Sequence, residues 1–107
     1  MISTHILDTT LGVTAKDVVV ELAKYDNKAW QVLSSEKTNS DGRIVFNCAA
    51  VAGVYRLKFA IEDYFLTNNV KPFFIVAPVV FKIEDINRNY HIPLLLNPFG
   101  YSTYRGS

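Results

Sequence analysis

Apolar and polar residues alternate with a period of two along most of this chain, and this alternation constrains the fold more than any other feature. Residues 54–61 give the clearest example, because an extended strand there places four apolar side chains on one face and Arg56 and Lys58 on the other. The four apolar side chains are Tyr55, Leu57, Phe59 and Ile61. Alternation of this kind is typical of strands that bury only one face, so it predicts a protein built mainly from antiparallel β-sheet.

Turn signals rich in Asn, Asp, Gly and Pro separate eight strand candidates. These candidates are residues 3–8, 18–22, 30–37, 43–47, 54–61, 79–84, 88–95 and 101–104. Residues 61–69 differ, because acidic residues near the start and Asn69 at the end favour a short helix. The length of 107 residues suits one domain with one core. We therefore expect a single domain over residues 1–107, an eight-stranded antiparallel sandwich or barrel with one short helix.

Charge and cysteine content exclude several classes of protein. The formal net charge of +1 gives no electrostatic argument for nucleic acid or an anionic membrane as a partner. Cys48 is the single cysteine, so a scaffold of intrachain disulfides is excluded. The first residues do not resemble a signal peptide, and no stretch reaches the roughly 18 apolar residues of a membrane helix. We therefore expect a soluble, cytoplasmic protein.

Three polar residues on the predicted strands are candidates for chemistry. His5 lies in the first strand candidate, Arg43 enters the fourth behind a Ser-Asp-Gly turn, and His91 lies in the seventh. Taken singly, such residues are more often structural or solvated than functional. His91 is the most unusual of the three, because it faces away from a row of apolar residues that suits a core. That row consists of Tyr90, Ile92 and Leu94.

The strand that carries His91 also contains Pro93, which has no backbone N–H. We therefore expect this strand to lie at a sheet edge or to be interrupted at the proline. Residues 92–96 are apolar on both faces, which a monomer with one face in water does not explain. We infer that the outer face of this strand meets another subunit.

Three blocks of sequence, together with their order and spacing, resemble the transthyretin-like family. They are STHILD at residues 3–8, TNSDGR at residues 38–43, and the stretch from residue 90 to the terminal YRGS at residues 104–107. The terminal YRGS is the most specific of these, since it is similar to the branch of 5-hydroxyisourate hydrolases rather than to the hormone-carrying transthyretins. The resemblance extends over essentially the whole chain.

The resemblance implies an eight-stranded transthyretin-like β-sandwich with a short helix after the fifth strand. It also implies a homotetramer whose sites lie in a channel between dimers, and it requires no cofactor. The implied reaction is hydrolysis of 5-hydroxyisourate to 2-oxo-4-hydroxy-4-carboxy-5-ureidoimidazoline by lactam ring opening in urate degradation. The residues that match the family's functional positions are His5, Arg43, His91, Tyr104 and Ser107.

These residue types suit the addition of water to an amide carbonyl. A histidine can transfer protons near neutral pH, and an arginine can bind the reacting carbonyl or the oxyanion that develops on it. We expect one of His5 and His91 to activate water and the other to orient it, with Arg43 on the oxyanion. Tyr104 and Ser107 would hydrogen-bond the edge of the heterocycle, alongside substrate contacts from His5 and Arg43.

Three other interpretations are compatible with parts of the sequence. Two histidines could suggest zinc, but no short His-rich or Cys-rich motif supplies the third protein ligand that catalytic zinc usually needs. A small-ligand-binding protein of transthyretin type would use the same fold without catalysis. A structural β-sandwich that serves only as an interaction module would show no small-molecule activity.

Overall fold

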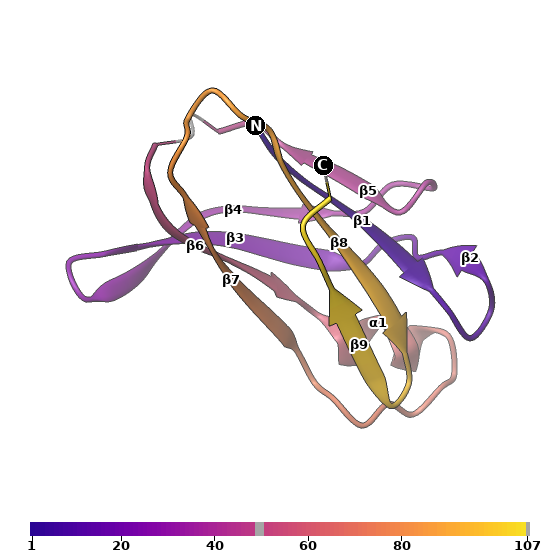
Figure 1. The fold of residues 1–107 in the computed structure, drawn as a ribbon. Coiled ribbons are helices and arrows are strands. Elements are labelled where there is room, and N and C mark those ends of the chain that lie inside the picture. The colour runs from indigo at the N-terminus through magenta and orange to yellow at the C-terminus, as the bar shows by residue number, and fades with distance from the viewer. Residues whose placement is uncertain (49–50, 107) are drawn as a thin grey trace.

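The protein is described here by a computed structural model that covers residues 1–48 and 51–106. Within these residues the chain forms two facing β-sheets, with the helix at one end of the sandwich (Figure 1). The elements are β1 (Ile2–Asp8), β2 (Val13–Thr14), β3 (Val19–Asp26), β4 (Ala29–Lys37), β5 (Arg43–Phe46), β6 (Gly53–Phe59), α1 (Ile61–Thr67), β7 (Ala77–Ile83), β8 (Tyr90–Asn97) and β9 (Gly100–Thr103). The predicted sandwich with one short helix is confirmed, and β2 is an additional strand of two residues.

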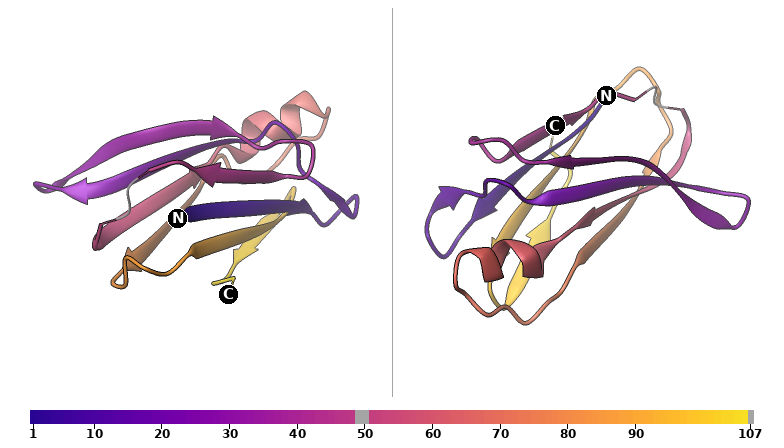
Figure 2. Two further views of the ribbon diagram at one scale, coloured as in Figure 1. Left: turned by 90° about the horizontal axis from the view of Figure 1, so that it is seen from above. Right: turned by 180° about the vertical axis from the view of Figure 1, so that it is seen from behind.

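The two sheets form separate layers, which are seen from above in Figure 2. One sheet has the order β2-β1-β8-β9, and β5 pairs with the first half of β1. The other sheet has the order β4-β3-β6-β7. All strand pairs are antiparallel except β1 with β8, which run parallel. The alternation of side chains fixes which face is buried but not the direction of a strand, so the sequence pattern did not reveal this parallel pair.

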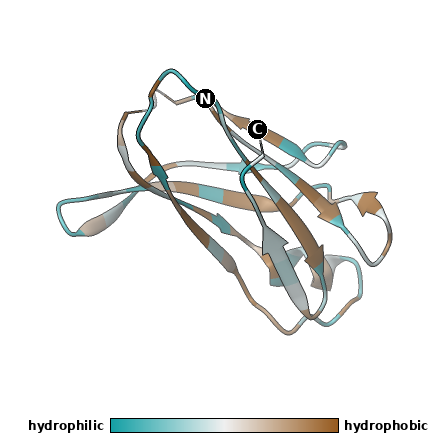
Figure 3. Ribbon diagram, in the orientation of Figure 1, coloured by the Kyte–Doolittle hydropathy of each residue, from teal (hydrophilic) through white to brown (hydrophobic). Residues whose placement is uncertain are grey.

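Apolar side chains from both sheets meet in one core between the layers. The apolar row predicted in residues 54–61 is confirmed, since Leu57 and Phe59 are fully buried. The same holds for the row that faces away from His91, because Tyr90, Ile92 and Leu94 all belong to the core. The hydrophobic stretches of β1 and β8 appear in brown in Figure 3. Apart from the buried Thr4 and Asp8, the polar side chains of this sheet are therefore expected on its outer face.

Strand β8 is an interior strand, so the prediction that it lies at a sheet edge was wrong. It pairs with β1 along Tyr90–Leu96 and with β9 from Leu94 onward. The alternative prediction, an interruption at the proline, applies to the pairing of β8 with β9. That pairing stops at Leu94, and among the described residues it resumes as an isolated bridge between His91 and Gly106. Pro93 lies in this gap, so the N–H that proline lacks is not needed for a hydrogen bond to β9.

Helix α1 is anchored to the end of β1 by a buried polar contact. The Tyr64 hydroxyl donates a hydrogen bond of 2.9 Å to Oδ2 of Asp8. The other carboxylate oxygen of Asp8 accepts hydrogen bonds from the backbone N–H groups of Thr10 and Leu11. The helix and the turn after β1 are therefore held together through a single carboxylate.

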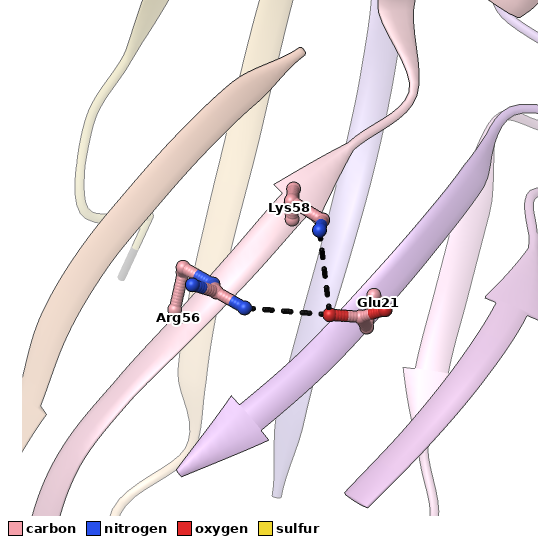
Figure 4. A network of polar contacts seen from close by, with 3 residues as sticks. All are labelled: Glu21, Arg56 and Lys58. Carbon is pink, nitrogen blue, oxygen red and sulfur yellow. Dashed lines mark hydrogen bonds and ion pairs between the residues drawn. The ribbon is translucent and has the colours of Figure 1, made fainter. Parts of the chain in front are cut away.

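The outer face of the other sheet carries paired charges. Glu21 on β3 forms ion pairs with Arg56 and Lys58 on β6, at 3.4 and 3.8 Å (Figure 4). The Arg56 guanidinium also lies 4.6 Å from the centre of the Trp30 ring. Compensated charges of this kind are typical of a solvated sheet face. In the described part of the chain no helix is both long and apolar enough to span a membrane.

Candidate active site

Three neighbouring strands, β5, β1 and β8, bring three of the predicted site residues, Arg43, His5 and His91, onto one face of a sheet. His5 on β1 lies opposite Arg43 on β5, and Ser3 on β1 lies opposite His91 on β8. Ser3 and His5 are two residues apart on one strand, so their side chains share a face. That face is the outer one, because Ile2, Thr4 and Ile6, which alternate with them, are buried.

The turn before β5 positions Arg43. The side-chain oxygen of Asn39 accepts hydrogen bonds from the backbone N–H groups of Asp41 and Arg43, at 2.9 and 3.0 Å. Gly42 has φ of +70°, and its carbonyl accepts a 2.8 Å hydrogen bond from the N–H of Ile6. A Cβ atom at Gly42 would lie 2.6 Å from the Ile6 carbonyl oxygen. Glycine is therefore required both by the backbone conformation and by the lack of space for a side chain. The turn therefore delivers Arg43 to the strand directly beside His5.

The ring of His91 is held by a side-chain hydrogen bond and lies near the Arg43 cation. The Ser3 hydroxyl lies 2.8 Å from Nδ1 of His91. Burial lowers the pKa of the His91 imidazole below its ordinary value, and the nearby Arg43 cation and His5 lower this pKa further. The neutral imidazole is therefore favoured, which suits a group that must accept a proton near neutral pH.

The C-terminal tail returns to His91. The backbone N–H of Gly106 donates a 2.8 Å hydrogen bond to the His91 carbonyl. The Arg105 guanidinium lies 5.0 Å from the centre of the Tyr90 ring. Tyr104 is 57% exposed and lines a pocket of about 150 Å³, between β7 and the tail, to which His91 also contributes. The tail therefore closes against the strand that carries His91.

The charge balance at this face differs from that of the opposite sheet. Among the described residues, the ion pairs join Glu21 to Arg56 and Lys58, and Lys82 to Glu84. Within that part of the chain Arg43 has no carboxylate partner. A guanidinium without a carboxylate partner beside two imidazoles can bind an electron-rich oxygen and stabilise negative charge that develops on it.

The structure thus brings His5, Arg43 and His91 together, and it places Tyr104 in a pocket that borders His91. Ser107, the remaining predicted site residue, lies outside the described residues. No group of three or more potential metal ligands occurs within residues 1–48 and 51–106.

Sequence reasoning included Ser3 and Gly106 in the family-like blocks but assigned neither a role at His91, where Ser3 bonds the ring and Gly106 bonds the backbone carbonyl. Alternation along β1 could have indicated that Ser3 shares a face with His5. The parallel pairing that brings Ser3 to His91 carries no signal in the sequence.

Comparison with known proteins agrees with this fold. The HIUase/Transthyretin family model matches residues 2–106. A 5-hydroxyisourate hydrolase of Halalkalibacterium halodurans is 44% identical, over 99% of this chain and 97% of that protein. The structure of Klebsiella pneumoniae 5-hydroxyisourate hydrolase aligns with a TM-score of 0.88 and 35% identity, covering 99% of this chain and 98% of the other.

The same fold also occurs in a carrier. Sea bream transthyretin in complex with thyroxine aligns with a TM-score of 0.92 and 30% identity, covering 98% of this chain and 93% of the other. The architecture alone therefore does not separate catalysis from ligand binding. Since the family model covers nearly every residue and the similarity to relatives runs the length of the sequence, this chain belongs to the HIUase/Transthyretin family.

Proposed function

We propose that this protein hydrolyses 5-hydroxyisourate, opening its lactam ring to give 2-oxo-4-hydroxy-4-carboxy-5-ureidoimidazoline in urate degradation. The observation that carries this proposal is the gathering of His5, Arg43 and His91 on one sheet face. A relative 44% identical over 99% of the chain is a 5-hydroxyisourate hydrolase, which supports the same reaction here.

In the proposed reaction, His91 accepts a proton from water as the water oxygen bonds to the lactam carbonyl carbon. The lowered pKa of His91 supports its assignment as this base, because it keeps the imidazole neutral near pH 7. His5 orients the water or the substrate. The ring C–N bond then breaks, and the departing nitrogen takes up the proton that His91 received.

Arg43 is proposed to bind the carbonyl oxygen and stabilise the oxyanion that forms on it. Its fixed charge and planar fork of N–H donors suit this task, and the turn at Gly42 holds its backbone in place. Tyr104 and Ser107 are proposed to bind the edge of the heterocycle together with His5. Neither a covalent nucleophile nor a cofactor is needed for these steps.

We also propose that the protein is a homotetramer with its sites between dimers. Apolar side chains surround the candidate site on the outer face: Val45, beside Ser3 in the sheet, is 60% exposed, and Leu95 on β8 is partly exposed. A second subunit would cover them. Light scattering coupled to size exclusion should give four times the chain mass of 12.1 kDa, and a monomer at micromolar concentration would contradict this proposal.

The alternative function is small-ligand binding without catalysis, as in a transthyretin. The high structural similarity to sea bream transthyretin favours this alternative as far as the fold is concerned. The polar cluster of His5, Arg43 and His91 favours hydrolysis, because a carrier with an apolar channel does not need it. Saturable ligand binding with no turnover of 5-hydroxyisourate would support the carrier.

The test of the proposed function starts from 5-hydroxyisourate generated in the cuvette by urate oxidase. Its ultraviolet absorbance should decay faster when this protein is added, and the product should be the ring-opened ureidoimidazoline. Decay at the spontaneous rate would rule the hydrolase out.

A further inference from the structure

We propose that Ser3 and Gly106 form a clamp that fixes the orientation of the His91 ring, and that both are positioning residues for the hydrolysis. This inference rests on the proposed function, since it assigns a role to groups that act through His91. Both residues lie in the family-like blocks of residues 3–8 and 104–107, but the sequence patterns assigned neither a role of its own. Both contacts come from chain segments at opposite ends of the sequence, which Figure 1 shows near the same end of the sandwich.

The first contact of the clamp is the hydrogen bond from β1. The Ser3 hydroxyl lies 2.8 Å from Nδ1 of His91, and the two residues are direct partners in the parallel ladder. The next residue, Thr4, is buried and donates a 2.6 Å hydrogen bond to the carbonyl of Ile92. Strands β1 and β8 are therefore also hydrogen-bonded at the next pair of residues, which leaves the Ser3 hydroxyl little freedom to move away from the ring.

The second contact of the clamp is the close approach of the tail backbone at Gly106, which leaves no room for a side chain beside the ring. A Cβ atom at Gly106 would lie 2.6 Å from Cδ2 of His91 and 3.3 Å from its Cβ. Real Cβ atoms do not approach other atoms as closely as 2.6 Å, so only glycine fits while the ring stays where it is. The Gly106 N–H is bonded to the His91 carbonyl at 2.8 Å, which prevents the tail from moving away without losing that bond.

The hydrogen bond is made at Nδ1 and the tail approaches at Cδ2, and these are the two ring atoms bonded to Cγ. Rotation of the ring away from Ser3 breaks the hydrogen bond, and a side chain at position 106 would displace either the ring or the tail. With both contacts present, Nε2 keeps one direction. A base gains from this, since proton transfer requires the acceptor nitrogen within hydrogen-bond reach of the water.

A serine hydroxyl also suits a ring that changes its protonation state. A base that accepts a proton at Nε2 carries its own hydrogen on Nδ1, so the Ser3 hydroxyl accepts a hydrogen bond from Nδ1–H both in the neutral ring and in the protonated ring. Ser3 can therefore hold His91 before and after the ring takes a proton at Nε2.

The kinetic test uses two variants with matched controls. Ser3→Ala removes the hydrogen bond, and Gly106→Ala introduces the steric conflict. We expect each to lower kcat by about 10- to 100-fold, the effect typical of removing a group that orients a histidine, with KM unchanged. Ser3→Thr keeps a hydroxyl and should retain kcat.

Two controls should leave kcat unchanged. Ser35→Ala alters an exposed serine of β4 in the other sheet. Gly100→Ala adds a Cβ whose nearest neighbour is the Asn97 side-chain oxygen, at 4.0 Å. A loss in either control as large as in its partner would mean that the effect is one of general stability, and would overturn the clamp.

A second readout does not depend on activity. The chain contains two histidines, so a His5→Ala variant assigns the imidazole nitrogen resonances to His91 in NMR spectra. The His91 ring resonances should move in Ser3→Ala and in Gly106→Ala, and should stay in place in both controls. Thermal unfolding shows whether Ser3→Ala and Gly106→Ala are folded. If one of them does not fold, the kinetics and spectra of the other test the clamp.

The outcomes separate the clamp from the function on which it rests. A wild-type protein that fails to accelerate 5-hydroxyisourate decay overturns the proposed function, while the spectra still show whether Ser3 and Gly106 hold the ring. If the wild-type protein is active, wild-type kcat in a folded Ser3→Ala or Gly106→Ala variant overturns the clamp.

Discussion

His5 on β1 lies directly opposite Arg43 on β5, so an imidazole and a guanidinium share the outer face of the sheet across one antiparallel pair. Neither side chain contributes to the core, because the residues that alternate with them are the buried ones. Substitutions at these two positions should therefore test chemistry separately from folding.

Replacing the polar residues of this face should reduce activity strongly while leaving the fold intact. We expect His5→Ala, Arg43→Ala and His91→Ala each to lose about 100- to 10,000-fold in kcat/KM, the range for removal of a positioned acid–base group. Arg43→Lys keeps the charge but loses the planar fork, so its loss should be intermediate. Steady-state kinetics measure these losses and circular dichroism checks folding; a fully active His91→Ala variant would refute the role of His91.

The acidic limb of the pH–rate profile should lie below the ordinary pKa of histidine. Burial, the Arg43 cation and His5 lower the pKa of His91 from 6.5, and the neutral ring is the form that accepts a proton. More than half of the plateau activity should therefore remain at pH 6.5, and the midpoint of the decline should lie below that pH. A limb centred above 6.5 would contradict this assignment.

The Arg43 contribution to this shift can be measured alone. In Arg43→Ala one cause of the lowered pKa is removed, so the pKa of His91 should rise, although burial continues to hold it down. NMR titration of the ring measures the change without any need for activity. Lys82→Ala is a suitable control, because the Lys82 ammonium on β7 is paired with Glu84, the first residue after that strand. An unchanged His91 pKa in Arg43→Ala would show that the two groups do not interact.

Tyr64→Phe should destabilise the protein, because it removes one partner from the buried Asp8 carboxylate. The expected loss is about 1–3 kcal/mol in the free energy of unfolding, as for a buried group left without one of its hydrogen bonds. Urea denaturation measures this loss. Tyr25→Phe, at a tyrosine that is 44% exposed on β3, is the matched control and should have little effect.

The same contact predicts a dependence of stability on alkaline pH. Burial and the neighbouring Asp8 raise the pKa of Tyr64 from 10.0 to about 12. Because the pKa is higher in the folded state, the stabilisation is fully present below pH 10.0 and is lost as the pH rises towards 12. Tyr64→Phe should lack this part of the pH dependence, and an unchanged slope would contradict the raised pKa.

Gly42→Ala should reduce both stability and activity. Gly42 combines a φ of +70° with a site where a Cβ would lie 2.6 Å from the Ile6 carbonyl oxygen. Gly12 has φ of +69° with nothing within 4 Å of an added Cβ, so Gly12→Ala measures the backbone strain alone, about 1–2 kcal/mol. Gly42→Ala should lose more than this in chemical denaturation and should also lower kcat, because the turn positions Arg43. Equal losses in the two variants would mean that the close approach at Gly42 is easily relieved.

The period-two alternation was sufficient to predict the strands and their buried faces. It was insufficient for the pairing of β1 with β8, because contacts between the two ends of the chain depend on how all the intervening strands pack. For the same reason the sequence left two alternatives for the strand containing Pro93, an edge position or an interruption at the proline. In the structure the proline lies where the β9 ladder is interrupted.

The candidate site was predictable residue by residue only where a local motif marked it. Arg43 follows a recognisable turn, and His5 and His91 lie in distinctive blocks of sequence. Ser3 and Gly106 are a small polar residue and a glycine, which are common in proteins and carry no chemical signal alone. Their contacts with His91 emerge only when two distant segments lie side by side.

The most direct measurement of the central claim is the decay rate of freshly generated 5-hydroxyisourate as a function of protein concentration. The first-order rate constant should rise in proportion to the concentration of wild-type protein. For the His91→Ala variant at the same concentrations, the slope should fall to near zero. A rate constant that stays at its spontaneous value at every wild-type concentration would contradict the assignment of this protein as a 5-hydroxyisourate hydrolase.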